Sequence, residues 1–554
     1  SFKSTDLNVS GGAVSDPRGS GTNLPNNSIA DASGQGNHWT INGIGAEDFV
    51  PDSPENNFPT GNPLIPIPSG SLSVGNLEFV RGSEATHGSC GTTFSLPTTG
   101  KWYWEVMSGK SANGESIGVA NIVDHNPQLP ANGSEVGSRS GDYIYRSTAS
   151  KISGGSSSSY GATYTGGDVI GVAWSSDDGT IIFYKNNSSQ GTAYSSITQA
   201  EGKYVPAVSN AETSSETVFN FGQDSSFAGH KTAQGNTDGN GIGDFYYAPP
   251  SGYLALCSSN LPEPTLGPNS DNNTSDFHTT TYYAGNDDAT RAFDLGFVAD
   301  WAWFKGDSSG YGHQMYDSSR GPQKYFRSNT YAAEATNSDG LLDFKADDAN
   351  DTSVDGSGTQ LKIGTDAFLN ESGTNVSLWT WRINGGTTAT NSNGSADSTV
   401  QVNTTVGMSQ VLYTGNATGA GAEQTIGHGL GVIPDVIMFK SRTYANMDWY
   451  ITHIGLADGT STHIELNVSD AEHGDADYMN QVAPTASVFS LGYNFTTNKS
   501  GESYIAYCFK SVEGYSKYGS FIGNGSTDGT YVYLGFRPQL VIAKCRSHSS
   551  SWHI

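Results

Sequence analysis

The residues best suited to hold an ion lie in a short polar stretch at residues 236–244. Side chains that carry oxygen stand at its positions 1, 3, 5 and 9: Asn236, Asp238, Asn240 and Asp244. Calcium takes about six to eight oxygen ligands, and twelve-residue calcium loops place donors at this spacing around a glycine, here Gly241. Because Tyr247 stands where such a loop carries its glutamate, Asp244 would have to replace it. The stretch is therefore open to two interpretations, a calcium site or a polar glycine-rich turn.

Aromatic side chains offer a second kind of chemistry, because their rings can stack on sugars. Three tyrosines lie in a Gly- and Ser-rich stretch that we expect to form loops between strands: Tyr143, Tyr145 and Tyr160. Three more aromatic residues follow a strand of the C-terminal half: Tyr444, Trp449 and Tyr450. Loops on a rigid β-scaffold often form recognition surfaces. We therefore predict these six residues as ligand-binding, with ordinary surface packing as the alternative.

No arrangement of residues predicts catalysis. Glycoside hydrolysis needs two carboxylates about 5–10 Å apart, but no motif selects a pair among the 54 acidic residues. A Gly-x-Ser-x-Gly elbow in a strand–turn–helix setting and an HExxH sequence are both absent. We expect a non-enzymatic protein without catalytic residues, which requires no cofactor apart from the calcium considered above.

Composition limits the class of protein. The 554 residues include 70 glycines, and 11% are aromatic, which indicates short strands joined by many turns and argues against disorder. A net charge of -27 repels phosphate backbones, so we exclude nucleic acid as a partner. Since no apolar run approaches about 20 residues, we expect no membrane insertion. Four widely spaced cysteines predict buried free thiols rather than a zinc site or a disulfide framework: Cys90, Cys257, Cys508 and Cys545.

The strand signal is clear from about residue 70 to residue 225. Residues 101–107 alternate, with Trp102 and Trp104 on one face, and Asp177-Asp-Gly179 predicts a hairpin between two further strands. Helical periodicity is almost absent, and we expect at most one short helix, at residues 470–482. The fold class predicted is all-β, a series of tandem antiparallel β-sandwiches.

A repeated motif divides the C-terminal half of the chain. The motif Leu-Gly-x-x-Pro-Asp-x-x-x-x-Lys occurs at residues 295–305, 430–440 and 534–544. Ala299 replaces the proline in the first copy, and Gln539 replaces the aspartate in the third. Trp449 and Trp552 follow the lysines of the second and third copies at nearly the same distance. A unit of a little over a hundred residues therefore repeats.

The expected domains follow from these signals. They are the C-terminal end of a module at 1–45, a Pro-rich linker at 46–74, a sandwich with a trailing segment at 75–262, a first repeat at 263–390, a second at 391–512 and the start of a third at 513–554. The chain begins at Ser1 and ends at Ile554 within a strand pattern, so we expect both ends to be cut from a longer protein.

Six segments carry a family resemblance through their order and spacing: Lys101-Trp-Tyr-Trp-Glu-Val106, Ser116-Ile-Gly-Val119, Gly167-Asp-Val-Ile-Gly-Val172, Asp178-Gly-Thr-Ile-Ile-Phe-Tyr-Lys-Asn186, Tyr204-Val-Pro-Ala-Val208 and Val218-Phe-Asn-Phe221. This region resembles a SPRY domain. Residues 31–39 resemble the end of a concanavalin-like jelly roll. Residues 248–261 and the tandem repeats are similar to the modules that follow SPRY in long phage fibre-like proteins.

The resemblance implies a structural and adhesive protein on the virion surface of a tailed phage. We expect a fibre that presents loops to a host-surface glycan or protein. Its other partners would be further virion proteins and copies of itself, because exposed strand edges favour a homo-oligomer. The alternatives are a bacterial surface or filament-forming adhesin and, less favoured, a polysaccharide depolymerase.

Overall fold

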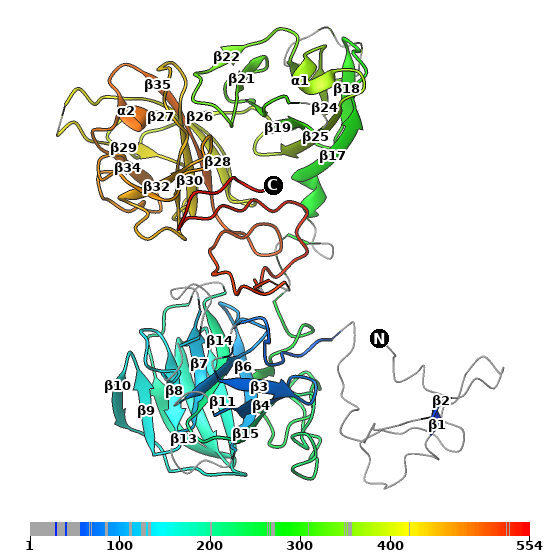
Figure 1. Ribbon diagram of the computed structural model, residues 1–554, viewed down its shortest axis with the longest axis vertical. Helices are drawn as coiled ribbons and strands as arrows, with labels where there is room; N and C mark the ends of the chain where they lie inside the picture. The colour runs from blue at the N-terminus through cyan, green and yellow to red at the C-terminus, as the bar shows by residue number, and fades with distance from the viewer. Residues whose placement is uncertain are drawn as a thin grey trace. The chain divides into compact units, whose positions relative to one another are not determined.

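The protein is described by a computed structural model. It covers residues 28–29, 39–40 and 56–554, apart from residues 66, 68, 84–86, 110–113, 123–128, 131–133, 200–201, 263, 265, 268–271, 308–309, 348–349, 351, 353–356, 420, 528 and 531. The described chain is almost entirely β, which confirms the predicted fold class (Figure 1). Two compact units form, one from Ser1–Pro262 with Ser520–Tyr533 and one from Glu263–Gly519 with Leu534–Ile554.

Little of the predicted N-terminal module can be described. Within residues 1–45 the described elements are β1 (Ser28–Ile29) and β2 (Trp39–Thr40), which pair antiparallel. The rest of that module lies outside the described residues. No helix in the described part of the chain has the length and apolar character needed to cross a membrane.

Unit 1 contains a sandwich of two antiparallel sheets (Figure 1). The first sheet contains, in spatial order, β13 (Ser188–Tyr194), β12 (Thr180–Lys185), β11 (Val169–Ser175), β6 (Lys101–Met107), β15 (Glu216–Asn220), β4 (Glu78–Arg81) and β3 (Gly70–Ser73), and the short β16 (Leu254–Ala255) pairs parallel to β6. The second contains β10 (Ser156–Ser159), β9 (Ser150–Ser153), β8 (Tyr143–Arg146), β7 (Ser116–Asn121), β14 (Tyr204–Asn210) and β5 (Gly88–Gly91).

The core of this sandwich follows from the alternation read in the sequence. Trp102 and Trp104 of β6 are buried in it together with Trp174 of β11. The predicted hairpin joins β11 to β12, and Gly179 in its turn has a φ of 60°. One boundary differs, because β3 lies inside the residues predicted as linker. It occupies an edge of the sheet, where a strand that follows several prolines is tolerated.

A trailing segment folds back over the outer face of the first sheet. The Phe227 ring is fully buried against Met107, Val169 and Val218. Asp224 holds the turn by accepting backbone N–H bonds from residues on both sides of that ring. This segment therefore belongs structurally to the sandwich and places its own side chains beside strands β4 and β15.

Unit 2 contains the two complete repeats. The first forms a sheet of β17 (His278–Ala284), β25 (Asn375–Trp381), β19 (Trp301–Gly306), β20 (Gln314–Asp317), β21 (Lys324–Phe326) and β22 (Ala335–Thr336). A second layer contains β18 (Arg291–Asp294), β24 (Gln360–Ile363) and β23 (Leu341–Ala346), with the short helix α1 (Ala367–Asn370) and a 3-10 turn, η3 (Thr274–Asp276).

The second repeat is built in the same order. Its sheet contains β26 (Ala389–Asn391), β27 (Ser398–Asn403), β28 (Met408–Thr414), β35 (Ser503–Phe509), β30 (Val436–Ser441), β31 (Tyr450–His453), β32 (Thr462–Glu465) and β33 (His473–Gly474). The other layer contains β29 (Gln424–Gly427) and β34 (Val488–Leu491), followed by α2 (Phe495–Asn498). Among the described residues of 513–554 we find isolated bridges rather than strands.

The repeated motif residues make equivalent structural contacts. Asp300 accepts a hydrogen bond from Ile383 N (2.6 Å), and Asp435 accepts one from Ser511 N (2.7 Å). Both aspartates thus satisfy backbone N–H groups just beyond the last strand of the sheet. The motif lysines donate to backbone carbonyls that follow shortly after the motif: Lys305 to Tyr311, Lys440 to Met447 and Lys544 to Ser550. The motif is therefore explained by folding alone.

The two complete repeats share one hydrophobic cluster. Trp301 and Phe326 of the first repeat pack in it with Trp449 and Tyr507 of the second. The rings of Trp301 and Tyr507 are stacked with their centroids 5.2 Å apart. Because this cluster is continuous, the two repeats pack as one body and are not independent domains joined by a linker.

A buried ionic network crosses the same boundary. The Arg320 guanidinium is fully buried and pairs with Asp317 (2.5 Å) and Glu334 (3.3 Å). Glu334 also pairs with Arg442 of the second repeat (2.8 Å), and the Tyr507 hydroxyl donates to Asp317 (2.6 Å). Such a network costs desolvation, but it fixes how the two surfaces meet, because each charge has only one satisfied arrangement.

A single tryptophan contact recurs from copy to copy. Trp449 donates through Nε1 to the carbonyl of Arg327 in the first repeat (3.2 Å). Trp552 donates in the same way to the carbonyl of Glu465 in the second repeat (2.9 Å). Arg327 follows β21, and Glu465 ends β32, the equivalent strand. Each tryptophan therefore docks on the same place of the preceding copy.

One predicted element is absent. Residues 470–482 contain β33 and turns rather than a helix. Tyr478 and Met479 are both fully buried, and the Tyr478 hydroxyl donates to the carbonyls of Gly459 (2.8 Å) and Thr462 (2.6 Å). The expectation of a helix was wrong because tertiary anchoring of these side chains determines the path of the backbone.

Candidate functional site

Of the three N-terminal tyrosines predicted on loops, Tyr145 is buried, and Tyr143 and Tyr160 are partly buried against the same core. Tyr143 and Tyr145 belong to β8, and Tyr160 follows β10. The Tyr145 ring is fully buried and contacts the rings of Tyr160 (5.2 Å between centroids) and Phe183 (5.4 Å). Tyr160 uses its hydroxyl to bond the carbonyl of Gly191 (2.6 Å). The loop placement was wrong for Tyr143 and Tyr145, which lie on a strand whose alternate residues face the core, whereas Tyr160 does lie in a loop, the one that follows β10.

The second aromatic group is also engaged by the protein. Trp449 is fully buried between the two repeats, so it cannot stack on a sugar as predicted. Tyr444 is half-buried beneath the Lys499 ammonium, which lies 3.2 Å from the ring centre. Tyr450 stacks on His463 with centroids 3.8 Å apart. Ligand binding by Tyr444 and Tyr450 stays a prediction, with one face of each ring already occupied.

The expected calcium loop is closed by protein donors. One Asp238 carboxylate oxygen accepts N–H bonds from Asn240 and Ile242 (2.9 Å each), and the other accepts from Ala255 N (2.9 Å) and from the Asn260 amide (2.7 Å). The Asp244 carboxylate accepts from Ser225, and the Asn236 amide donates to backbone carbonyls. The Asn240 side chain bonds to Asn260 (2.9 Å). Calcium here stays a prediction that these bonds argue against.

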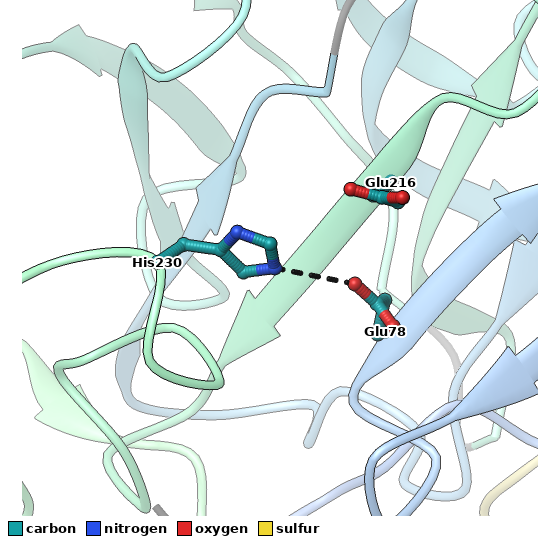
Figure 2. A group of neighbouring side chains, drawn as sticks. All are labelled: Glu78, Glu216 and His230. Carbon is teal, nitrogen blue, oxygen red and sulfur yellow. Dashed lines mark hydrogen bonds and ion pairs between the residues drawn. The ribbon is translucent and has the colours of Figure 1, made fainter.

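A different set of side chains converges on one face of the first sheet, over β4 and β15. Glu78 of β4 and Glu216 of β15 are diagonal neighbours on one sheet face, since the register pairs Glu216 with Val80 and Val218 with Glu78. His230 reaches them from the trailing segment (Figure 2). One ligand atom from each of the three side chains lies within 4.8 Å of the others. In the described part of the chain, these three residues form the one group of three or more His, Cys, Asp or Glu side chains that lie close enough together to hold an ion.

The contacts inside this group are few. His230 Nε2 lies 3.3 Å from a Glu78 oxygen, and the other Glu78 oxygen accepts a hydrogen bond from the Ser73 hydroxyl (2.6 Å). The Glu78 side chain is 12% exposed and that of His230 is 37% exposed. Within the described residues, the Glu216 carboxylate has no hydrogen-bond or ion-pair partner. Two carboxylates thus face one imidazole at the border of solvent.

A recess of about 460 Å³ opens beside this group. Its lining includes Glu216, His230, Lys231, Ser108–Gly109 and the turn at residues 165–167. Glu115 holds Gly109 and the strand that carries Glu216 by accepting bonds from Gly109 N (3.1 Å) and the Thr217 hydroxyl (2.6 Å). Full burial raises the pKa of Glu115. The recess combines acidic, basic and backbone polar groups, which suits recognition of a polar ligand.

Sequence reasoning missed this site for a physical reason. Glu78, Glu216 and His230 are far apart in the chain and share no motif. They meet only because β4 pairs with β15 and because the buried Phe227 pins the segment that carries His230. The strand register was the one signal available, and it requires knowing which strands are neighbours.

Comparison with known families defines the class of protein. Residues 101–224 match the SPRY domain family, so the sandwich of unit 1 is a SPRY domain. Residues 273–554, half of the chain, match the family described as a domain of unknown function, DUF7483. The chain therefore belongs to the DUF7483 family.

Solved structures align with the SPRY region at low sequence identity. A human SPRY domain is 14% identical and aligns over 28% of this chain and 96% of its own, with a TM-score of 0.24. The SPRY domain of human HERC1 is 18% identical over 29% of this chain and 96% of its own, with a TM-score of 0.25. No curated protein sequence matches the chain.

Proposed function

We propose that this chain is a non-enzymatic adhesive protein, a fibre on the virion surface of a tailed phage whose SPRY domain attaches to a host-surface glycan or protein. The observation that carries the adhesive part is the recess between Ser108–Gly109, residues 165–167 and His230–Lys231, at the border of the SPRY sandwich. Loop-lined recesses on rigid sandwiches can vary in ligand without disturbing the core. The phage setting is supported by the sequence resemblance of the modules.

The packed repeats suit a rigid support. Their continuous aromatic cluster and the buried Arg320 network hold two modules in one orientation. A fibre needs such fixed geometry to present a binding module away from its attachment point. Copies of this chain would associate through strand edges, of which the exposed Ser156–Ser159 of β10 is one.

Electron microscopy of native particles with peptide mass mapping tests the setting. Spikes or fibres on phage particles that contain these peptides would support the proposal. Filaments or sheets on cells without virions would favour the alternative, a bacterial surface adhesin. Release of sugars from host polysaccharide by the purified protein would favour a depolymerase.

A substitution tests whether the recess is the binding surface. Thr165→Arg places a large side chain at its exposed rim, and Ser195→Arg makes the same kind of change at an exposed loop position of the sandwich outside the recess. We expect Thr165→Arg to abolish binding to host cells and Ser195→Arg to retain it. Equal binding by both variants would refute the assignment of the recess.

A further inference from the structure

We propose that Glu78, Glu216 and His230 bind one divalent transition-metal ion, with zinc as the best fit, at the wall of the SPRY recess. The proposal does not depend on the phage setting or on what the recess binds. It begins with the donor set, which combines one imidazole nitrogen with two carboxylates. Imidazole favours zinc and related metals over calcium and magnesium, and a His-and-carboxylate set is an ordinary zinc environment.

The distances fit a tetrahedral ion with little movement. Zinc binds imidazole nitrogen and carboxylate oxygen at about 2.1 Å, so two ligand atoms of a tetrahedral site lie about 3.4 Å apart. His230 Nε2 and the nearer Glu78 oxygen are already 3.3 Å apart. Since the three ligand atoms lie within 4.8 Å of one another, Glu216 must move closer by at most about 1.4 Å, which side-chain rotation allows because its carboxylate has no partner among the described residues.

The surroundings hold two of the ligands in place. Ser73 donates to the outer Glu78 oxygen (2.6 Å), which leaves the inner oxygen directed at His230. Such outer hydrogen bonds orient metal ligands in known sites. The turn that carries His230 is fixed by the bond from His230 N to the carbonyl of Phe227 (3.1 Å), whose ring is buried. Little ordering would therefore remain when the ion binds.

Two further observations support a bound ion: the charge of the two glutamates and the position of two ligands in the lining of the recess. Glu78 and Glu216 place two carboxylates as diagonal neighbours on adjacent strands of a chain with a net charge of -27, and a cation bound between them would offset their repulsion. Glu216 and His230 also line the recess. Three protein ligands leave a fourth tetrahedral position, which this arrangement directs toward the recess, as in sites where zinc contacts a second molecule.

Zinc titration of the whole chain tests the proposal. The purified protein is stripped with EDTA and titrated with Zn²⁺ by calorimetry, and Co²⁺ absorbance reports the nitrogen and oxygen ligands. We expect one saturable site, with Glu216→Gln and His230→Asn each weakening Zn²⁺ binding about tenfold or more. Ser73→Ala should weaken it less and keeps all three ligands, so it serves if a ligand variant fails to fold.

A matched control uses another exposed histidine with an acidic neighbour. His473 lies 3.8 Å from Asp470 in unit 2, and no third ligand accompanies them in the described structure. His473→Asn should bind Zn²⁺ like the parent, and Zn²⁺ should raise the melting temperature of unit 1 alone. Zinc binding that is unchanged in Glu216→Gln and His230→Asn, or lost equally in His473→Asn, would overturn the proposal. Measuring host-cell binding in EDTA separates the two proposals: binding that persists without the metal would leave the attachment function intact while the zinc site is tested by titration alone.

Discussion

Replacing Trp449 with alanine tests whether the repeats form one cooperative body. Its side chain is fully buried, its ring contacts that of Phe326 edge-on (5.3 Å between centroids), and its indole N–H bonds to the carbonyl of Arg327. Truncating a buried tryptophan costs about 3–5 kcal/mol, because the transfer free energy is lost and a cavity remains. Unit 2 is large, so each kcal/mol lowers its melting temperature by about 2–4 °C. We expect a total decrease of about 6–20 °C.

Differential scanning calorimetry measures this change with an internal reference. The chain divides into two compact units, so the transition of unit 1 should stay in place while that of unit 2 moves. Tyr331→Ala is the control, because the Tyr331 side chain is 57% exposed in the first repeat and its loss should matter little. A shift below about 2 °C for Trp449→Ala would refute the reasoning, and so would equal shifts of both transitions.

Three further results are expected. Asp317→Asn should lower the free energy of unfolding of unit 2 in urea by about 3–5 kcal/mol, since it leaves the buried Arg320 charge short of a partner, and a loss below 1 kcal/mol would contradict this. Burial lowers the pKa of His453 to about 4 and raises that of Glu105 to about 7. Acidification from pH 6.5 toward 4.5 should therefore destabilise unit 2, because His453 gains a proton in the unfolded state before it does so in the folded state. It should stabilise unit 1, because Glu105 keeps its proton when folded and loses it on unfolding, by at most about 3 kcal/mol for each unit. His453→Gln and Glu105→Gln should flatten the respective pH profiles, and parallel movement of the two melting temperatures would contradict the assignment. Asp238→Ala should lower the melting temperature of unit 1 equally in calcium and in EDTA, whereas protection of the parent by calcium would restore the calcium interpretation.

Local patterns predicted the strands well because the sandwich core selects them directly. The alternation around Trp102 and Trp104 gave β6, and the Asp-Gly turn gave the β11–β12 hairpin. The same rule, applied to Tyr143 and Tyr145, would have placed both rings in the core. Their Gly- and Ser-rich surroundings suggested a loop, although a Tyr-Ile-Tyr run is typical of a strand.

Contacts between distant segments could not be read in this way. Asp238 has the spacing of a calcium ligand, but its acceptors are filled by Ala255 and Asn260, which only the folded chain brings near. Conversely, Glu216 and His230 carry no local signal and become a candidate site through sheet register. Trp449 was conspicuous in the sequence for its place after the motif, yet its partner, the carbonyl of Arg327, is a backbone group that no side-chain pattern reveals.

The direction of the tryptophan contact has a consequence for synthesis on the ribosome. Trp449 and Trp552 each dock on a strand end that belongs to the copy before them, and that copy emerges first. An earlier repeat can therefore fold first. The strand end that accepts the next tryptophan is then already formed when the later repeat emerges. Assembly in this order keeps the apolar faces of unfinished repeats exposed only briefly, which lowers the risk that neighbouring copies exchange strands.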